Sequence, residues 1–445
     1  MKLSYNWLKD YLECDLTPEQ IAGYMTSIGI EVDGVEQQEQ IPGGLEGVVV
    51  AVVLECEPHP DSDHLHITKV DDGTGEPLTV VCGAPNVAAG QKVLFARLGT
   101  VLPGDFKIKK SRIRGIESFG MICAEDELGI GDSHEGIMVL PQDAEVGTPA
   151  REFLHLKTEA VIEYEITANR VDAASHIGVA RDLYAYLKLN GIPCRLQYPS
   201  VDAFKEGSGK GIGVEVLDPA GAPRYTGITI KGVKVAPSPK WLQERLVSIG
   251  LKPINNIVDI SNFVLFEIGQ PLHTFDAGKI RGGKVIVRRA FEGESIRTLD
   301  GTDRILKSTD MVIADAEGPM CIAGVFGGEN SGVTDDTVDV FVESAYFAPA
   351  SIRKTSKIHG LQTDASFRYE RGADPLIPPY ALKRAVSLIQ ECAGGTVTGG
   401  IQEVYPAPIG RKVIDLDYSR INAFIGQEIK VSDIEGCAGC VEYAA

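Results

Sequence analysis

A carboxylate within an apolar stretch is the side chain in this sequence whose setting most clearly invites chemistry. Glu343 lies in Phe341-Val-Glu343-Ser-Ala-Tyr-Phe347, and strand alternation would place it on the same face as Phe341. Two interpretations stay open: Glu343 faces solvent, or it is a buried acceptor. A buried carboxylate needs a hydrogen-bond donor, and a ligand hydroxyl is one candidate.

Three further strings combine small residues with one or two hydrogen-bonding groups. They are Gly269-Gln-Pro-Leu-His273-Thr-Phe-Asp276, Val325-Phe-Gly327-Gly-Glu329-Asn-Ser-Gly332 and Thr363-Asp-Ala365-Ser-Phe-Arg-Tyr-Glu-Arg-Gly372. No G-x-S-x-G elbow, Walker A loop or H-E-x-x-H motif occurs in the sequence, so nucleophilic catalysis has no support from these patterns.

Five cations gather in one short stretch of an otherwise acidic chain. They are Lys107, Lys109, Lys110, Arg112 and Arg114. Such a run, taken alone, is typical of a solvated edge, and contact with a phosphate backbone is the alternative. Because 43 Lys and Arg face 62 Asp and Glu, for a net charge of −19, any contact with nucleic acid must be local.

Two groups of potential metal ligands are better explained without a metal. In His59-Pro-Asp61-Ser-Asp63-His64-Leu-His66 the proline and the turn residues predict a polar loop. Cys437-Ala-Gly-Cys440 lacks the second ligand pair of a zinc site. We expect no bound metal.

A glycine-rich segment could suggest a dinucleotide-binding loop. Gly209-Lys-Gly-Ile-Gly213 lacks the preceding strand and the third glycine of such a loop, so it is interpreted as flexible chain.

The length of 445 residues predicts roughly three domains. A composition of 44% hydrophobic and 24% charged residues is typical of globular proteins, and 49 Gly with 24 Pro favours β-rich modules.

The longest apolar run, Val48 to Leu54, is too short to span a membrane. The first ten residues lack a signal-peptide pattern. With nine scattered Cys residues, we expect a cytoplasmic protein with reduced thiols.

Two separated helices are expected to pack together. Thr17-Pro18-Glu19-Gln20 predicts a helix start that runs to Gly29, and apolar spacing predicts a second helix from about Ala174 to Asn190. The block between them, about 45 to 149, is then an insertion that suits a small β-barrel, of which the oligonucleotide-binding (OB) barrel is one form. Its expected strands are Gly47 to Leu54, His64 to Asp71, Leu78 to Cys82, Lys92 to Ala96 and Gly120 to Ala124.

A larger α+β unit is expected between two glycine-rich linkers, Glu206 to Gly213 and Gly399 to Gly410. The last 35 residues are expected to begin a further module. The expected elements of the α+β unit are a helix from Ser238 to Gly250, strands at Lys284 to Arg289 and Met311 to Ala314, and a helix from Pro379 to Cys392.

In the strings that contain His273, Gly327, Glu343 and Thr363, the sequence closely resembles the β chains of bacterial phenylalanyl-tRNA synthetases. The resemblance extends over nearly the whole chain, although Gly436 to Ala445 depart from the family pattern and the family's chain is considerably longer. Besides the four strings above and the His59 block, it rests on Met1-Lys-Leu-Ser-Tyr-Asn-Trp-Leu, Val81-Cys-Gly-Ala-Pro-Asn-Val87, Ile113-Arg-Gly-Ile-Glu-Ser-Phe-Gly-Met-Ile-Cys-Ala-Glu-Asp-Glu-Leu-Gly129 and Asn169-Arg170.

The resemblance implies a multidomain α+β architecture. An N-terminal α+β domain would comprise two segments, 1–40 and 150–198, interrupted by a tRNA-binding OB-fold barrel at 41–149. A large α+β editing domain would follow at 212–395, and then the start of a small helical module resembling a nucleic-acid-binding fold at 405–445.

The resemblance also implies a function within an α2β2 enzyme that charges tRNA(Phe). The α subunit would use ATP and Mg to attach phenylalanine, while this segment would bind no cofactor and contain no catalytic residue for charging. The β chain would bind tRNA and hydrolyse mischarged Tyr-tRNA(Phe). A non-catalytic tRNA-binding scaffold and a free-standing hydrolase of mischarged tRNA remain the alternatives.

The site residues follow from the same resemblance. Glu343 would accept the phenol hydroxyl of tyrosine, while Gly327, Thr363 and Ala365 would shape the pocket. His273 would lie near the ester and the 3′-adenosine, where we expect it to position water or the ribose instead of acting as an obligatory base. The cations at 107, 109, 110, 112 and 114 would contact the tRNA backbone.

Overall fold

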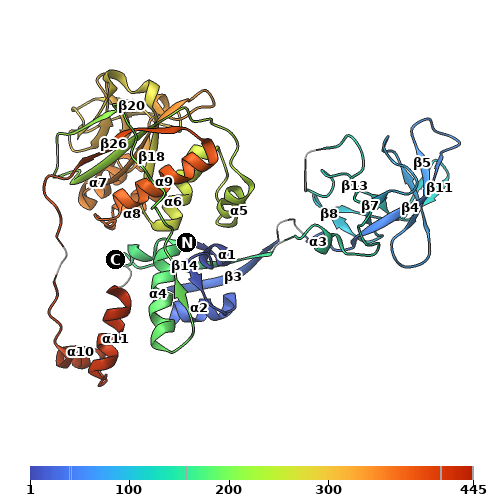
Figure 1. Ribbon diagram of the computed structural model, residues 1–445, viewed down its shortest axis with the longest axis horizontal. Coiled ribbons are helices and arrows are strands. Elements are labelled where there is room, and N and C mark those ends of the chain that lie inside the picture. Colours follow the sequence, from blue (N-terminus) through green and yellow to red (C-terminus); the bar gives the residue numbers. More distant parts are fainter. Residues whose placement is uncertain (40, 42, 132, 157, 411–412, 443–445) are drawn as a thin grey trace. The chain divides into compact units, whose positions relative to one another are not determined.

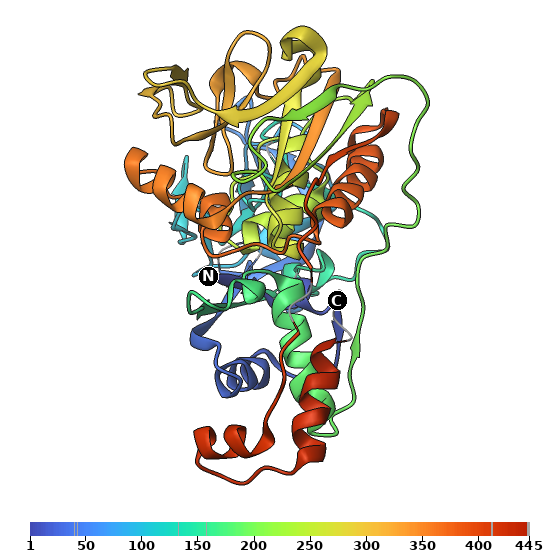
Figure 2. The ribbon, with the colours of Figure 1, turned by 90° about the vertical axis from the view of Figure 1, so that its left-hand side faces the viewer.

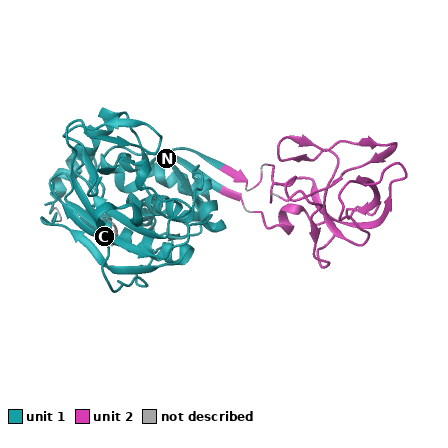
Figure 3. Ribbon diagram, turned by 90° about the horizontal axis from the view of Figure 1, so that it is seen from above, with its two compact units in different colours: residues 1–36, 160–445 teal, residues 37–159 magenta. Residues whose placement is uncertain are grey.

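The computed structural model describes the chain except for residues 40, 42, 132, 157, 411–412 and 443–445. It is a mixed α+β structure with two compact units, residues 37–159 and residues 1–36 with 160–445 (Figure 3). None of the described helices combines the length and hydrophobicity that a membrane span requires.

Residues 37–159, which are unit 2 in Figure 3, are built on an antiparallel sheet with the order β12-β7-β4-β5-β6, and β13 also pairs with β7. Phe119 N donates to Thr79 O of β6 at 2.9 Å, which nearly closes the sheet into a barrel. Its strands are β4 (Val48–Pro58), β5 (His66–Asp71), β6 (Leu78–Cys82), β7 (Lys92–Ala96), β12 (Met121–Ile122) and β13 (Val139–Leu140). Two small hairpins and a helical turn complete the unit: β8 (Val101–Leu102), β9 (Phe106–Lys107), β10 (Ser111–Ile113), β11 (Ile116–Ser118) and α3 (Ala150–Phe153).

The apolar run in β4 explains the position of this strand at the centre of the sheet. Val48 and Val50 pack into one core and Val49 and Val53 into another, so both faces of the strand are buried. The predicted strands at 78–82 and 92–96 are confirmed. The strand predicted at 120–124 is reduced to residues 121–122.

The N-terminal part of unit 1 in Figure 3, residues 1–36 with 160–445, forms a three-stranded sheet with the order β1-β14-β3. The capping box predicted at Thr17 and Gln20 is confirmed. The rings of Tyr24 and Tyr186 lie 5.0 Å apart, so α2 and α4 pack together as expected (Figures 1 and 2). The elements are β1 (Lys2–Ser4), α1 (Tyr5–Leu8), β2 (Leu12–Glu13), α2 (Pro18–Ser27), β3 (Glu31–Glu39), β14 (Thr158–Glu165), η1 (Val171–Ala173), α4 (His176–Leu189) and β15 (Arg195–Leu196).

The rest of this unit contains two larger sheets, ordered β18-β25-β17-β26 and β16-β19-β22-β23-β24. Their strands are β16 (Gly213–Val216), β17 (Arg224–Lys231), β18 (Leu272–Asp276), β19 (Lys284–Arg289), β22 (Met311–Ala314), β23 (Pro319–Ile322), β24 (Phe326–Gly327), β25 (Asp339–Tyr346) and β26 (Thr396–Val404). The hairpin of β20 (Ser295–Arg297) and β21 (Asp303–Ile305) lies outside these sheets. The strands predicted at 284–289 and 311–314 are confirmed.

Five helices accompany these two sheets. They are α5 (Lys240–Ser248), α6 (Asn256–Ile268), α7 (Pro349–His359), α8 (Asp364–Tyr369) and α9 (Pro378–Ala393), with 3-10 turns η2 (Ala277–Lys279), η3 (Arg281–Gly283) and η4 (Glu329–Ser331). The helices α6 and α9 lie side by side (Figure 1). Strand β25 separates two cores, because Val340 and Val342 pack with these helices whereas Phe341 and Ala345 face the second sheet. Glu343 shares the face of Phe341, as the alternation predicts.

Both predicted linkers are wrong in part. Residues 399–404 belong to β26, which pairs with β17. In the other segment, Gly207 N donates to Gly399 O at 2.9 Å, and a Cβ at Gly207 would lie 1.7 Å from Val397 O. Gly213 already begins β16, which pairs in parallel with β19. These glycines permit close backbone approach in an ordered segment, so they do not mark flexible chain.

The C-terminal residues include two helices, α10 (Tyr418–Ile425) and α11 (Val431–Glu442). The expected helical module at 405–445 also covers residues 411–412 and 443–445, which lie outside the described residues. Gly426 ends α10 in the left-handed conformation, with a φ of 81°, as the sequence of this segment suggests.

Candidate functional site

A cavity of about 260 Å³ contains all five residues expected in the editing site: His273, Gly327, Glu343, Thr363 and Ala365. They come from β18, β24, β25 and the N-terminal end of α8. The remaining lining is mostly apolar and includes Leu265, Leu272, Leu299, Val325 and Phe326. An apolar cavity with few polar groups suits an aromatic side chain whose recognition depends on one or two hydrogen bonds.

Strand pairing brings the two titratable side chains of the cavity together. In the antiparallel pair of β18 and β25, His273 lies directly opposite Glu343, so their side chains project from the same face of the sheet. Glu343 is only 4% exposed. It is therefore the buried acceptor of the two interpretations, and not a residue that faces solvent.

Glu343 receives a hydrogen bond from a tyrosine on the neighbouring strand. Tyr225 Oη donates to Glu343 Oε2 at 2.8 Å, and among the described residues no other side chain bonds to this carboxylate. Burial raises the pKa of the Glu343 carboxyl to about 8, and the hydrogen bond from Tyr225 opposes this shift. With Oε2 engaged by Tyr225, Oε1 is the oxygen left for a hydrogen bond with a ligand's hydroxyl.

His273 is a neutral imidazole with an unused ring nitrogen. Its Nε2 is buried and has no hydrogen-bond partner within the described part of the chain. Burial lowers the pKa of His273 to about 4, so the ring is uncharged at neutral pH. The ring meets Phe275 edge to face, with centroids 4.4 Å apart. A ligand or a water molecule can supply the missing partner, as donor or acceptor according to the tautomer.

Gly327 leaves the space that the histidine ring needs. A Cβ at this position would lie 3.0 Å from His273 Cε1 and 2.8 Å from Leu299 Cδ1. Both distances are shorter than ordinary carbon contacts. Gly327 therefore shapes the cavity through the absence of a side chain, as the sequence resemblance implies.

Thr363 fixes the wall of the cavity through its hydroxyl. Its Oγ1 accepts from Ser366 N at 3.1 Å as the N-cap of α8 and donates to Val325 O at 2.9 Å. The cap stabilises the helix, and the second bond ties it to the turn before β24. Ala365 follows in the first turn, where its small side chain limits the intrusion of α8 into the cavity.

Two tyrosines and an asparagine of the site were not found by sequence reasoning. Tyr225 holds Glu343, while Asn262 and Tyr369 line the cavity. Tyr369 Oη donates to Ala345 O at 3.0 Å. An aromatic residue within the apolar strand at 224–231 was the available signal for Tyr225, but alternation does not reveal which residue lies opposite it.

The five cations of the basic stretch are exposed in the other unit, residues 37–159, on two small hairpins and on the segment 108–110 that connects them. Arg114 and Gly115 form the two-residue turn between β10 and β11, with φ values of 43° and 88°. Positive φ at both positions is the geometry of a tight hairpin turn. The turn also places the guanidinium of Arg114 against Asp61 O.

These cations differ in how far the protein already neutralises them. Lys110 Nζ lies 2.8 Å from Glu117 Oε2, and Arg112 Nε donates to Gly115 O at 3.2 Å. Lys107 and Lys109 have no ion pair among the described residues, and they line a cavity of about 570 Å³ together with Phe106. Phe106 is 56% exposed. Free cations beside an exposed aromatic ring suit phosphates and unstacked bases.

The histidine-rich loop of this unit is organised by ordinary hydrogen bonds. His59 Nδ1 accepts from Asp61 N at 3.1 Å, and His64 Nδ1 lies 2.9 Å from the Asp63 carboxylate. Among the described residues, no three His, Cys, Asp or Glu side chains are grouped so as to hold a metal ion.

Two protein families match parts of the chain. The "Putative tRNA binding domain" family matches residues 48–149, which form the barrel, and the "B3/4 domain" family matches residues 221–394, which surround the cavity of Glu343. The chain thus belongs to the class of proteins that combine these two domains.

Individual relatives narrow the class. The chain is 55% identical to the "Phenylalanine--tRNA ligase beta subunit" of Bacteroides fragilis over 99% of this chain and 54% of that protein. The subunits of Porphyromonas gingivalis and Geobacter sulfurreducens are 52% and 45% identical, over 99% and 100% of this chain and 54% of each relative. This chain is therefore a member of the phenylalanine--tRNA ligase beta subunit family, and it spans about half the length of the relatives that it matches.

Proposed function

We propose that this chain provides the tRNA-binding and editing parts of a phenylalanyl-tRNA synthetase β subunit. The buried acceptor Glu343, placed opposite His273 in the wall of an apolar cavity, carries the proposal. The finer arrangement is part of it: an N-terminal domain in two segments, an OB-fold barrel between them, an editing domain and the start of a helical module. The family matches and the relatives support this assignment.

The need for such a cavity follows from the chemistry of the two amino acids. A pocket built for phenylalanine rejects tyrosine by only about a hundredfold, because the added hydroxyl leaves none of the pocket's own polar groups without a partner. A second site can instead select for the hydroxyl, which phenylalanine lacks. A site that must satisfy a buried acceptor discriminates against a ligand without the hydroxyl by about 10⁴-fold or more, and Glu343 is such an acceptor.

In the proposed reaction, water attacks the carbonyl carbon of the ester between tyrosine and the tRNA 3′ end. The ester C–O bond breaks, and free tyrosine and a tRNA with its terminal hydroxyl are released. Glu343 binds the phenol, Tyr225 holds the carboxylate, and the neutral His273 positions the attacking water or the ribose. Gly327, Thr363 and Ala365 leave room for the tyrosine ring.

The exposed cations of the barrel would contribute affinity without reading the sequence of the RNA. Lys107 and Lys109 are placed for this by their lack of ion pairs among the described residues. In the whole enzyme, a partner α subunit would perform the ATP- and Mg-dependent charging in an α2β2 assembly in the cytoplasm. We assign no nucleotide or metal to the present chain.

The direct test is deacylation of Tyr-tRNA(Phe) by this chain, with Phe-tRNA(Phe) as the control substrate. We expect release of tyrosine that is selective over phenylalanine and is lost in Glu343→Ala. Activity without an α subunit would also show that the chain can work as a free-standing hydrolase. Binding of tRNA without any deacylation, also after addition of the α subunit, would instead establish the scaffold alternative.

A further inference from the structure

A second polar cavity, of about 800 Å³, lies beside the residues that flank α8 at its two ends. Three of its lining side chains are cations, Arg353, Lys357 and Arg371, and one is an anion, Glu370; Gln362 and Ala168 also contribute. A net positive cavity is unusual in a chain with a net charge of −19. Local positive charge in an acidic protein attracts anionic groups to that place.

The single carboxylate of this cavity neutralises one cation at most. Glu370 Oε1 pairs with Arg371 Nη1 at 2.8 Å. Arg353 Nη2 donates to the backbone oxygen of Glu370 at 2.7 Å, which fixes the guanidinium without cancelling its charge. Lys357 has no ion pair with any described residue. Since Arg353 and Lys357 are four residues apart in α7, they project from the same face of that helix.

Arg371 is held in place before any ligand arrives. Its guanidinium carbon lies 3.7 Å from the centroid of the Phe367 ring, and its Nη1 also donates to Phe367 O at 3.1 Å. Its Nε is buried and lacks a hydrogen-bond partner among the described residues. A guanidinium that is already fixed and lines a cavity is suited to a phosphate oxygen.

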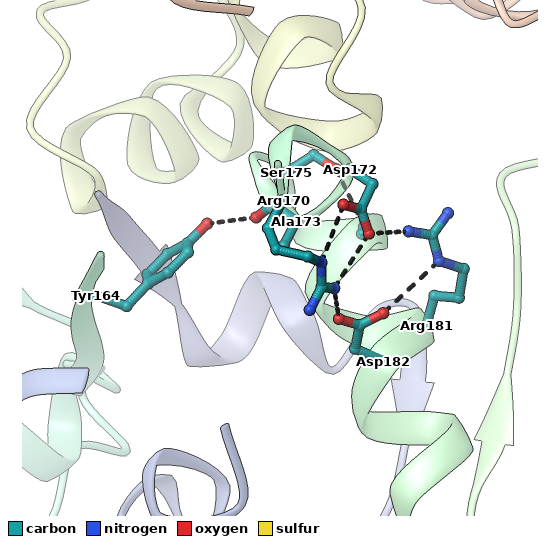
Figure 4. Close-up of polar contacts among 8 residues, drawn as sticks. Tyr164, Arg170, Asp172, Ala173, Ser175, Arg181 and Asp182 are labelled. Carbon is teal, nitrogen blue, oxygen red and sulfur yellow. Dashed lines mark hydrogen bonds and ion pairs between the residues drawn. The ribbon is translucent and has the colours of Figure 1, made fainter. Parts of the chain in front are cut away.

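Ala168 contributes to the cavity from the loop between β14 and α4, which an ion-pair cluster makes rigid (Figure 4). Arg170 pairs with both Asp172 and Asp182, and Arg181 Nη2 lies 2.7 Å from Asp172 Oδ2. The two arginines and two aspartates balance one another. The cluster therefore fixes the loop without adding net charge to the cavity.

Two more bonds tie this loop to the surrounding structure. Tyr164 Oη donates to Ala173 O at 3.0 Å (Figure 4). The fully buried Arg368, which belongs to α8, donates from Nη2 to Ala174 O at 2.8 Å. Helix α8 is thus bonded to the loop that borders the cationic cavity.

The two cavities meet at both ends of α8. Thr363 and Tyr369 line the cavity of Glu343, whereas their chain neighbours Gln362 and Glu370 line the cationic cavity. Consecutive Cα atoms are about 3.8 Å apart. An RNA end whose terminal ester enters the first cavity therefore has its adjoining phosphates within reach of the second.

We propose that the cationic cavity binds the phosphate groups of the single-stranded 3′ end of the substrate tRNA, beside the ester that enters the cavity of Glu343. This inference rests on the proposed editing function and adds the site that holds the RNA. Arg353, Lys357 and Arg371 supply the contacts. An acidic peptide could also be attracted by these charges, but the adjacency to the ester-binding cavity at residues 362–363 and 369–370 favours RNA.

The test compares the double variant Arg353→Ala/Lys357→Ala with Lys354→Ala. Lys354 is exposed on the same helix and does not line the cavity, so it controls for lost charge. Deacylation is measured with Tyr-tRNA(Phe) and with tyrosyl-adenosine, an ester without phosphates. We expect the double variant to lose about tenfold in kcat/KM on the tRNA, to keep its rate on tyrosyl-adenosine, and to show a salt dependence shallower by about 2 in log-log slope.

Equal losses on both substrates would overturn the proposal, because they would indicate damage to the hydrolytic cavity itself. An unchanged double variant, or a Lys354→Ala variant that loses as much, would overturn it as well. If the unmodified chain hydrolyses neither ester, the editing proposal fails, and the phosphate site is then tested by the affinity of deacylated tRNA(Phe). In that assay, equal tRNA affinities with weaker binding of an oligoglutamate peptide to the double variant would make the cavity a peptide site.

Discussion

In the proposed function, the cavity around Glu343 and the basic hairpins of the barrel bind the same substrate by opposite means. The cavity is lined mostly by apolar residues and depends on one buried carboxyl group, that of Glu343, which Tyr225 already holds. The cations of the hairpin region are exposed, and Lys107 and Lys109 have no ion pair among the described residues. Burial makes each hydrogen bond of the cavity selective, because an unmatched polar group is costly there. Exposure makes the hairpins tolerant, since water and salt can replace any single contact.

The largest effect that the comparison predicts is at the buried carboxylate. Glu343→Ala removes the acceptor and leaves Tyr225 Oη without its partner, so we expect a loss of at least about a hundredfold in kcat/KM for Tyr-tRNA(Phe). The measurement is single-substrate deacylation, with circular dichroism to verify folding. Glu215→Ala, which removes an exposed carboxylate paired with Lys284 on the neighbouring sheet, should leave the rate unchanged. A variant at 343 with normal tyrosine release would remove the distinction between the two regions.

The steric part of the cavity predicts a smaller effect. Gly327→Ala places a methyl group against His273 and Leu299, and we expect deacylation to fall about tenfold because a displacement of about 1 Å near the reacting atoms has effects of this order or larger. Gly332→Ala is the matched control, since a Cβ there meets its nearest atom at 3.8 Å. Equal behaviour of the two variants in a deacylation assay would contradict the tight packing inferred for His273.

The pKa values of the cavity predict a dependence on pH that the exposed cations should not share. With the pKa of Glu343 at about 8, the ionised fraction of the carboxyl rises from about 10% at pH 7 to about 90% at pH 9. A carboxylate accepts the phenol hydrogen bond more strongly than the neutral acid does. The ratio of kcat/KM for Tyr-tRNA(Phe) over Phe-tRNA(Phe) should therefore rise by up to about tenfold over this range.

Spontaneous hydrolysis of the ester at each pH must be subtracted in this measurement. His273 contributes no second inflection between pH 5 and 7, because burial lowers its pKa to about 4 and the ring stays neutral there. A flat ratio across pH 7 to 9 would show that Glu343 acts in one protonation state throughout.

The smallest effect is expected at the barrel. Lys107→Ala/Lys109→Ala should weaken tRNA binding a few-fold at low salt and lower the log-log salt slope by about 2, because each lysine contributes one phosphate contact. Binding is measured between 50 and 200 mM salt. Lys240→Ala/Lys252→Ala removes the same charge from exposed positions in the other unit and serves as the control. Equal salt slopes of tRNA binding for the two double variants would show that the basic stretch is a solvated edge that does not contact phosphates.

Local patterns predicted several elements of the fold and missed others for physical reasons. The capping box at Thr17 predicted a helix start, and the apolar runs at 284–289 and 311–314 predicted strands. These predictions succeeded because each depends only on residues within the element itself. The glycines at 207 and 399 were misinterpreted as linker residues, since composition does not distinguish a flexible glycine from one that permits close packing. That distinction depends on which backbone lies opposite.

The sequence predicted less of the candidate site than of the fold. Alternation placed Glu343 on the face of Phe341, but its donor Tyr225 is 118 residues away in the sequence, and no local period reports such a pair. The grouping of His273, Gly327, Thr363 and Ala365 came from the family resemblance, not from spacing. The cationic cavity escaped notice because its residues are divided between the loop at 168 and helices that follow much later.

The placement of the barrel sequence between β3 and β14 has a consequence for the order of folding. Strand β1 pairs with β14, with Lys2 opposite Glu163, so the N-terminal sheet needs contacts of very high sequence separation, which form slowly. During synthesis the barrel can fold while β14 is still missing. Leu3 and Trp7, both fully buried in the finished protein, remain exposed through that interval. We expect this stage of translation to be the one at which the nascent chain most depends on chaperones.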